Sequence, residues 1–354
     1  NTGWTAGNDG LILRTDDGGL EWRRLSEGGR EDVADIFFLD NSSGWAVGGR
    51  GRILATSSGG RHWTVRPSNT TARLNDVFFI NANYGWTVGE GGTILRSIDG
   101  GITWARRKIG TTEELFGVHF VDGEHGWVVG AGGAVLHTED GGETWARQRS
   151  TTNAWLEAVH FVDRKRGVAV GARGTILRTE DSGETWQSVD VNVAEWLYAV
   201  TFADRQRGFT VGGSGIILRT DDGGQTWKDQ ESGAGINLYA VAATGRHEAV
   251  AVGDQGRVLQ TRNGGATWDM LSTITSQPLF AVAYRGGSAA WVAGRGGVIL
   301  RRTDAVATLK LPRRKSPPVL RGATVQDTSE ATTPLPLDDG DIPRAVPPGG
   351  RSTP

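Results

Sequence analysis

Residues 85–104 have the sequence GWTVGEGGTILRSIDGGITW, in which short apolar segments alternate with glycine-rich breaks. The break at 89–92 predicts a tight reversal, because glycine adopts positive φ without the steric penalty of a Cβ atom. In the second break, the side chain of Asp99 can accept hydrogen bonds from the amides of its own turn, and Trp104 can pack beneath the hairpin. The stretch therefore predicts antiparallel strands joined by two tight turns.

The same pattern recurs every 41 residues without insertion or deletion. In one copy, residues 74–81 (LNDVFFIN) precede the quoted stretch and residues 104–108 (WARRK) end it. Each copy thus has four strand-length segments rich in β-branched and aromatic residues, and none has a helical period. The tryptophans that mark the register are Trp22, Trp63, Trp104, Trp145, Trp186, Trp227 and Trp268.

A four-stranded sheet that is apolar on both faces has to stack against neighbouring sheets. Four strands in a repeat of about 40–45 residues are typical of a propeller blade. The sequence therefore predicts an all-β propeller of four-stranded antiparallel blades over residues 1–308, truncated at its N-terminus within the first blade. Eight copies of the second-to-third turn favour eight blades, and seven blades with a surplus hairpin are the alternative.

The character of the chain changes at Leu309. Nine of the eleven prolines lie after residue 311, and tryptophan and phenylalanine are absent there. Such a composition cannot bury enough apolar surface to fold. Residues 309–354 are therefore predicted to be a disordered Pro-rich linker or tail.

Composition excludes several classes of function. The net charge of −2 offers no electrostatic attraction to nucleic acid, and the lack of cysteine excludes disulfides and thiolate chemistry. No segment approaches the roughly 18 apolar residues of a membrane span. We expect a monomer without cofactor or metal and without direct membrane insertion. His119 and His160 share one register in neighbouring copies, but two ligands are too few for a metal site.

Residues 97–104 resemble the Asp-box, or bacterial neuraminidase repeat, of the pattern Ser/Thr-x-Asp-x-Gly-x-Thr-Trp. With the Gly-Trp-x-Val-Gly and Gly-x-Ile-Leu-Arg-Thr segments, the chain resembles the photosystem II stability/assembly factor-like family from residue 3 to about 303. The resemblance implies an extracytoplasmic propeller, in the periplasm, a lumen or at the cell surface. It also implies a protein partner, such as a subunit of a membrane complex that is being assembled or stabilised.

The Asp-box residues recur in nearly every copy, whereas a reaction centre needs one unique set. They are therefore predicted to be structural. The central aspartates are Asp17, Asp99, Asp140, Asp181 and Asp222. The seven tryptophans that mark the register are assigned to the core.

Residues that break the repeat are better candidates for function. Trp155 and Trp196 precede the first strand in adjacent copies, where the other copies carry no tryptophan. Exposed aromatic pairs can anchor a partner or a sugar ring, although these two could equally pack on each other and cover the channel mouth. Tyr198 and Tyr239 would enlarge the patch. The arginines predicted to lie on the same face are Arg50, Arg73, Arg173 and Arg295.

A carbohydrate-binding or sialidase-like hydrolytic propeller is the alternative function. Resemblance to sialidases would require three arginines around a substrate carboxylate, a Tyr nucleophile with a nearby Glu, and an acidic Asp. The chain has four tyrosines, and the constant spacing leaves no room for the inserted loop on which such sites are built. We therefore expect a binding scaffold that is not an enzyme.

Overall fold

The computed structural model describes residues 33–271 except 41 and 59–61, residues 276 and 278–284, and five further strand segments. These segments are 3–6, 12–15, 23–24, 290–294 and 299–301. Residues 1–304 form one compact unit. Asp17, Trp22, Arg295 and the tail predicted over residues 309–354 lie outside the described residues.

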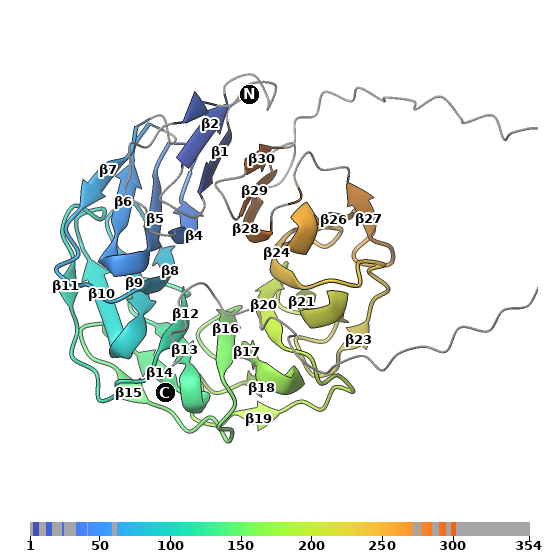
Figure 1. Cartoon of the computed structure of the whole chain (residues 1–354). Helices are drawn as coiled ribbons and strands as arrows, with labels where there is room; N and C mark the ends of the chain where they lie inside the picture. The colour runs from blue at the N-terminus through green and yellow to red at the C-terminus, as the bar shows by residue number, and fades with distance from the viewer. Residues whose placement is uncertain are drawn as a thin grey trace, which may run out of the picture. The chain divides into compact units, whose positions relative to one another are not determined.

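The described strands form eight antiparallel sheets, six with four strands and two with three, and in each sheet consecutive strands pair. Within the compact unit, the sheets follow one another around a central axis (Figure 1). This confirms the predicted all-β propeller of meander blades. Among the described residues, no helix is long and apolar enough to cross a membrane.

The bounds of the strands repeat at the spacing of the sequence. The four-stranded sheets are β4 (Val33–Phe38), β5 (Gly44–Gly48), β6 (Ile53–Thr56), β7 (Thr64–Arg66); β8 (Leu74–Phe79), β9 (Gly85–Gly89), β10 (Thr93–Ser97), β11 (Ala105–Arg106); β12 (Leu115–Phe120), β13 (Gly126–Gly130), β14 (Val135–Thr138), β15 (Ala146–Arg147); β16 (Leu156–Phe161), β17 (Gly167–Gly171), β18 (Ile176–Thr179), β19 (Gln187–Ser188); β20 (Leu197–Phe202), β21 (Gly208–Gly212), β22 (Ile217–Thr220), β23 (Lys228–Asp229); and β24 (Leu238–Thr244), β25 (Glu248–Gly253), β26 (Val258–Thr261), β27 (Asp269–Leu271). The three-stranded sheets are β1 (Gly3–Ala6), β2 (Ile12–Thr15), β3 (Arg23–Arg24) and β28 (Leu279–Tyr284), β29 (Ala290–Gly294), β30 (Ile299–Arg301).

The innermost strands contact one another in the order β4, β8, β12, β16, β20, β24 and β28, and β28 also contacts β4. The sheet that starts with β1 has no strand in this inner series among the described residues, and β1 lies against β29 and β30. Eight described sheets therefore accompany seven described innermost strands. The choice between eight blades and seven with a surplus hairpin stays a prediction.

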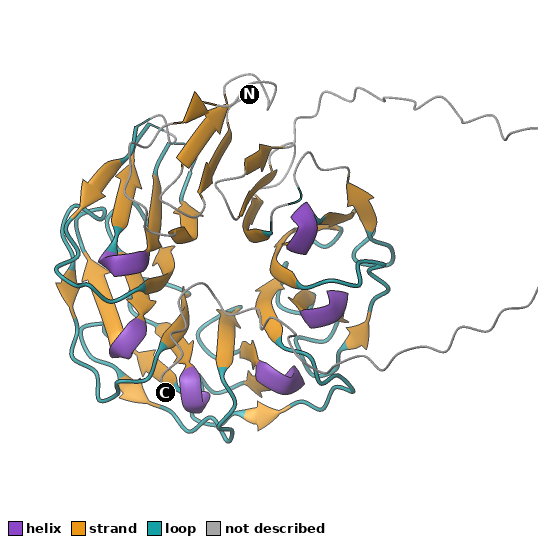
Figure 2. Cartoon of the chain, in the orientation of Figure 1, coloured by secondary structure: helices purple, strands orange, loops and turns teal. Residues whose placement is uncertain are grey.

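The second-to-third turns in the continuously described region are single 3₁₀ turns, drawn in purple in Figure 2. They are η2 (Gly49–Gly51), η3 (Glu90–Gly92), η4 (Ala131–Gly133), η5 (Ala172–Gly174), η6 (Gly213–Gly215) and η7 (Asp254–Gly256). The last residue of η3 shows why glycine is needed. Gly92 has φ +63, and a Cβ there would lie 2.1 Å from the carbonyl oxygen of Thr111. Positive φ and a close backbone neighbour both exclude a larger residue.

Aromatic residues pack neighbouring blades together. Trp86 of β9 is fully buried and stacks on Phe120 of the next blade, with ring centroids 3.5 Å apart. Its Nε1 donates a hydrogen bond to the carbonyl oxygen of Gly141, 2.9 Å away in the Asp-box turn of that blade. Trp45 and Trp127 make the same two contacts with the blades that follow theirs. The inter-blade contacts that close-pack the propeller therefore come from the repeated residues.

Candidate functional site

A β-bulge lies near the start of every innermost strand. The pairing of β16 with β17 skips one residue between Leu156 and Ala158, so that Glu157 has no directly opposed partner. A bulge of this kind redirects the side chain of the extra residue. The extra residues at this register in the other blades are Ala34, Asn75, Phe116, Tyr198, Tyr239 and Phe280.

The aromatic residues among those at the bulges, together with two tryptophans that precede innermost strands, form a continuous chain of rings. We call this chain the aromatic arc; its members are Phe116, Trp155, Trp196, Tyr198, Tyr239 and Phe280. Phe116 stacks on Trp155 with centroids 5.4 Å apart, and Trp155 meets Trp196 edge to face at 5.9 Å. Trp196 is 6.3 Å from the ring of Tyr198, which lies 5.3 Å from Tyr239. Tyr239 in turn lies 5.4 Å from Phe280, which ends the arc. The structure thus brings together four residues that the sequence singled out.

Exposure differs along the aromatic arc. Trp155 is 42% exposed, whereas Phe116, on which it stacks, is 8% exposed. Trp196, Tyr198 and Tyr239 are half-buried. The hydroxyl group of Tyr239 is hydrogen-bonded to Asp254, with oxygens 3.1 and 3.2 Å apart. Trp155 is therefore exposed to water, while its ring packs on Phe116 and Trp196.

Carboxylates flank the aromatic arc. Glu157 follows Trp155 by two residues, and its Oε1 atom is buried without a hydrogen-bond partner among the described residues. Burial, together with the negative charge of Glu114, raises the pKa of Glu157 to about 7. Burial and the charges of Glu157 and Asp254 raise the pKa of Tyr198. The surface of the arc is therefore aromatic, and the ionisable side chains that flank it are carboxylic acids.

A polar relay leads from β8 to the acidic side of the arc. The Nε atom of Arg73 donates to Asn75 Oδ1 at 3.0 Å, and Asn75 Nδ2 donates to Glu114 Oε1 at 3.0 Å. Arg73 is only 8% exposed. The sequence predicted a partner-binding arginine on the surface here, but the structure buries this guanidinium group and engages it within the protein.

The other predicted arginines lie apart. Arg50 and Arg173 occupy the middle of η2 and η5 with φ of 53 and 57, and both are exposed. They stand three blades apart in the chain. Arg295 lies outside the described residues. Arg173 lies beside the aromatic arc, because the amide of the preceding residue, Ala172, donates a hydrogen bond to the carbonyl oxygen of Trp155.

The innermost strands also carry a buried carboxyl pair, Asp35 and Asp76. Asp35 Oδ2 accepts a hydrogen bond from the amide of Val77, and Asp76 Oδ2 accepts one from the amide of Val118. Each carboxyl therefore links its blade to the next. Burial raises the pKa of both groups, and that of Asp76 is raised further by the charge of Asp35.

The two histidines considered as metal ligands are packed strand residues. The rings of His119 and His160 have centroids 4.4 Å apart. Burial lowers the pKa of His160 to about 4, and burial and the neighbouring His160 lower that of His119 well below its usual range. Asp122, Glu124 and His125 also lie close enough together to hold a metal ion, but Asp122 and Glu124 are paired with Arg164.

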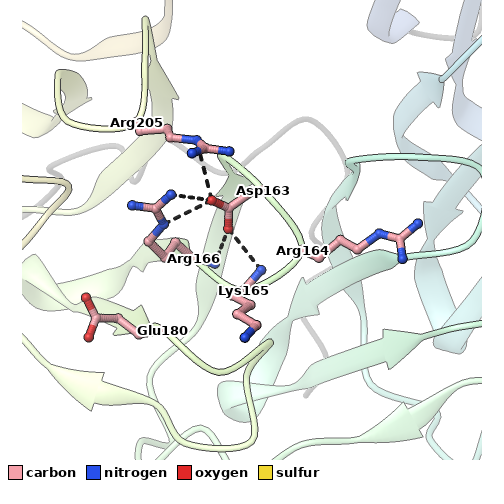
Figure 3. Close-up of a pocket in the computed structure, with 6 residues that line it drawn as sticks. All are labelled: Asp163, Arg164, Lys165, Arg166, Glu180 and Arg205. Carbon is pink, nitrogen blue, oxygen red and sulfur yellow. Dashed lines mark hydrogen bonds and ion pairs between the residues drawn. The ribbon is translucent and has the colours of Figure 1, made fainter.

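A hollow of about 580 Å³ opens at the turn between the first and second strands of one blade. In Figure 3, Arg166 and Arg205 both point toward Asp163 at its centre. The pairing and hydrogen bonds from the turn hold the pKa of Asp163 below its usual range in spite of partial burial. The charged side chains around the hollow are therefore largely paired with one another. The residues around the hollow are Asp163, Arg164, Lys165, Arg166, Glu180 and Arg205.

The Asp-box carboxylates hold their own turns. Asp140 Oδ1 accepts hydrogen bonds from Thr138 Oγ1 at 2.8 Å and from the amide of Thr144 at 2.9 Å, and Asp140 Oδ2 accepts one from Thr144 Oγ1 at 2.6 Å. Slight burial opposes ionisation, but these bonds lower the pKa of Asp140 to about 2. Asp99, Asp181 and Asp222 make the same set of contacts. Among the described tryptophans that mark the register, the buried ones are Trp104, Trp186 and Trp268, and the half-buried ones are Trp63, Trp145 and Trp227.

Sequence reasoning missed Phe116, Glu157 and Phe280. A signal was present, since the position directly after the repeated leucine varies between copies, whereas the leucine itself recurs. That this position forms a bulge depends on how the strands pair, which the sequence alone did not show.

Known proteins resemble the chain in its repeats and in its fold. The family described as photosynthesis system II assembly factor YCF48 matches residues 67–154 and 184–236. The solved structure of "YCF48 bound to D1 peptide" has 21% identity and a TM-score of 0.64, and the match covers 77% of this chain and 93% of that one. "YCF48 from Cyanidioschyzon merolae" has 22% identity and a TM-score of 0.64, with coverage of 77% and 95%.

A glycoside hydrolase propeller is also similar in structure. The GH74 xyloglucanase from Xanthomonas campestris has 14% identity and a TM-score of 0.64, covering 80% of this chain and 53% of the enzyme. At such identities the structural likeness shows the fold alone. No curated protein is significantly similar to the chain in sequence. The residues that the family matches lie in the repeated blades, so the chain is a β-propeller that resembles photosystem II assembly factors.

Proposed function

We propose that the chain is a non-catalytic scaffold whose aromatic arc docks an extended segment of a partner protein. The observation that carries this proposal is the unbroken series of ring contacts from Phe116 to Phe280, with Trp155 42% exposed at its surface. Tryptophan and tyrosine are the side chains most often found at the energetic centres of protein interfaces. The arc therefore has the composition of a docking surface.

The support beneath the arc favours binding without rearrangement. Each arc residue sits on or next to an innermost strand, and the strands are held by Trp86, Trp127 and their equivalents between blades. Rigid anchors lose little conformational entropy on binding. The relative whose structure contains a D1 peptide is a propeller of the same repeat type, which supports a peptide as the bound partner.

We further propose that the partner belongs to a membrane protein complex and that the propeller acts outside the cytoplasm as a monomer. The partner and the location rest on the resemblance to assembly factors. Labelling of intact cells with a membrane-impermeant reagent tests the location, because an extracytoplasmic propeller reacts before lysis. Sedimentation equilibrium tests the monomer.

A carbohydrate-binding or hydrolytic propeller is the second candidate, favoured by the GH74 likeness and by the pairing of Tyr239 with Asp254. Burial and the carboxylate raise the pKa of Tyr239, which makes its oxygen a weak nucleophile near neutral pH. A sialidase-like site also needs an arginine triad. Of the predicted arginines that the structure describes, Arg73 is buried and Arg50 and Arg173 lie three blades apart, so these three do not form a triad and the scaffold is preferred.

The proposal is tested by photo-crosslinking in native membranes. The double variant Trp155→Ala with Trp196→Ala is expected to lose the crosslinked partner while it keeps the melting temperature of the wild type within a few degrees. The matched control is Ile98→Ala with Ile102→Ala, which removes two exposed apolar side chains from an Asp-box turn. Equal capture by the two variants would contradict the proposal. Glycan binding that disappears only in the tryptophan variant would favour the carbohydrate candidate instead.

A further inference from the structure

The acidic part of the aromatic arc holds a buried oxygen atom whose hydrogen-bonding capacity is unused. Glu157 Oε1 has no partner among the described residues, although a buried acceptor left unpaired costs free energy. Unpaired buried polar groups are uncommon in native proteins, so each one needs a structural explanation, such as a bound water, ion or ligand. Glu157 follows Trp155 by two residues and its charge acts on Tyr198, so the unused acceptor lies next to the proposed docking surface.

The charges around Glu157 are mainly negative. Glu114 is close enough to oppose its ionisation, and Tyr198 lies close enough to respond to its charge. Asp254 acts on Tyr198 from the other side. Arg73 donates to Asn75, which donates in turn to Glu114, and Arg173 is exposed on η5. A ligand with a positive charge would offset the negative charges that act on Glu157 and Tyr198.

We propose that Trp155, Glu157 and Tyr198, with Glu114 beside them, bind the cationic side chain of a lysine or arginine in the partner's peptide. This rests on the proposed function and names the residue type that the surface recognises. The apolar stem of the lysine or arginine packs along the rings of Trp155 and Tyr198, and its N–H groups donate to the carboxylate of Glu157. Aromatic rings attract cations through their electron-rich faces, and a charged donor strengthens a hydrogen bond to a carboxylate.

Other ligands fit these residues less well. An acidic peptide would place like charges beside Glu114 and Glu157. A neutral sugar could stack on Trp155 but would leave the paired acids without a counter-charge. A metal ion would need more ligands than the two carboxylates of Glu114 and Glu157. The combination of rings with unpaired acid therefore selects an organic cation.

The test uses the full chain and four pools of blocked heptapeptides, with randomised flanks and a central lysine, arginine, norleucine or glutamate. Norleucine is the matched probe, because it keeps the stem of lysine and removes its charge. Lysine and arginine pools are expected to bind at least about fivefold more tightly than the norleucine pool, in line with a desolvated cation over rings. The glutamate pool is expected to bind most weakly.

Variants separate the cation site from general docking. Glu157→Gln is expected to bring the ratio of lysine to norleucine affinity close to one, whereas the control Glu184→Gln, on an exposed Asp-box position, leaves that ratio unchanged. A peptide selected from the lysine pool is also expected to release protons on binding near pH 7, measured by calorimetry in buffers of different ionisation enthalpy. Glu157→Gln should abolish this release.

The outcomes distinguish the two proposals. If lysine and norleucine pools bind equally and both depend on Trp155, the cation inference fails and the scaffold stands. If no pool binds, both fail. If the lysine preference survives Glu157→Gln with circular dichroism unchanged, the assignment to Glu157 is overturned.

Discussion

Trp155 and Trp196 contact each other edge to face, with ring centroids 5.9 Å apart and ring planes inclined by 79°. They occupy one register in adjacent blades, so the contact crosses the boundary between two copies of the repeat. The sequence leaves mutual packing and partner binding open as explanations of this pair. The structure shows the packing, and the 42% exposure of Trp155 leaves a face for a partner.

The tryptophan pair is expected to contribute to stability as a coupled unit. Trp155→Ala and Trp196→Ala should each lower the free energy of unfolding, and the double variant should lose less than the sum. The coupling is expected to be about 1 kcal/mol, as for other edge-to-face aromatic pairs. Urea unfolding of the four proteins measures it. Strictly additive losses would show that the contact has no energetic weight.

Stability is expected to fall as pH rises through the range in which Glu157 ionises. Its folded pKa of about 7 lies above the unfolded value near 4.3, so the folded state holds the proton more tightly. The stabilisation that comes from holding this proton is fully present below about pH 4.3 and is lost as pH rises through about 7. Because the residue is only half-buried by surface area, the loss is expected to be on the order of 2 kcal/mol.

Urea unfolding between pH 4.5 and 8 checks this dependence. Glu157→Gln should flatten the curve, and Glu184→Gln should follow the wild type. Asp76→Asn should remove a separate part of the same slope, because burial raises the pKa of Asp76 as well. A wild-type slope in Glu157→Gln would rule out this assignment.

An Asp-box carboxylate is expected to stabilise its turn. Asp140→Ala removes the acceptor for Thr138 Oγ1, for the amide of Thr144 and for Thr144 Oγ1. Since Asp140 is exposed to water, the expected cost is about 1 kcal/mol. Glu139→Ala changes the exposed neighbouring side chain and should have little effect. Equal denaturation midpoints for the two variants would argue against the role of Asp140.

Gly142 is expected to tolerate no side chain. It has φ +83, and a Cβ there would lie 2.6 Å from Trp86 Nε1, which bonds to the preceding residue. Gly142→Ala should therefore cost more than about 3 kcal/mol, since backbone strain and overpacking combine.

Two further glycines separate strain from steric contact. Gly91 has φ +61, but a Cβ there would meet no atom within 4 Å, so Gly91→Ala should cost about 1 kcal/mol. Gly123 also has open space and lacks positive φ, so Gly123→Ala should change stability by less than about 0.5 kcal/mol. Thermal unfolding of the three alanine variants measures the order of their losses in stability. The same loss in Gly91→Ala and Gly142→Ala would mean that the contact with Trp86 is unimportant.

The sequence by itself determined the repeated part of this protein. Period, strand segments and turn glycines follow from local requirements, because Gly92 or Asp140 has to satisfy the geometry of its own turn in each copy. The tryptophans at constant spacing mark the register of the blades, and three of the six that the structure describes are buried. Such features repeat in the sequence and are visible there.

Only the tertiary structure decided what the unrepeated residues do. Arg73 looked like a surface arginine but is buried and bonded to Asn75. Glu157 looked unremarkable, but its Oε1 atom is buried without a partner among the described residues and its charge acts on Tyr198 of the next blade. The aromatic arc exists because a bulge near the start of each innermost strand redirects one residue, and closure then brings residues about 40 positions apart into contact. Contacts between blades depend on this packing in space, for which one copy of the repeat carries no information.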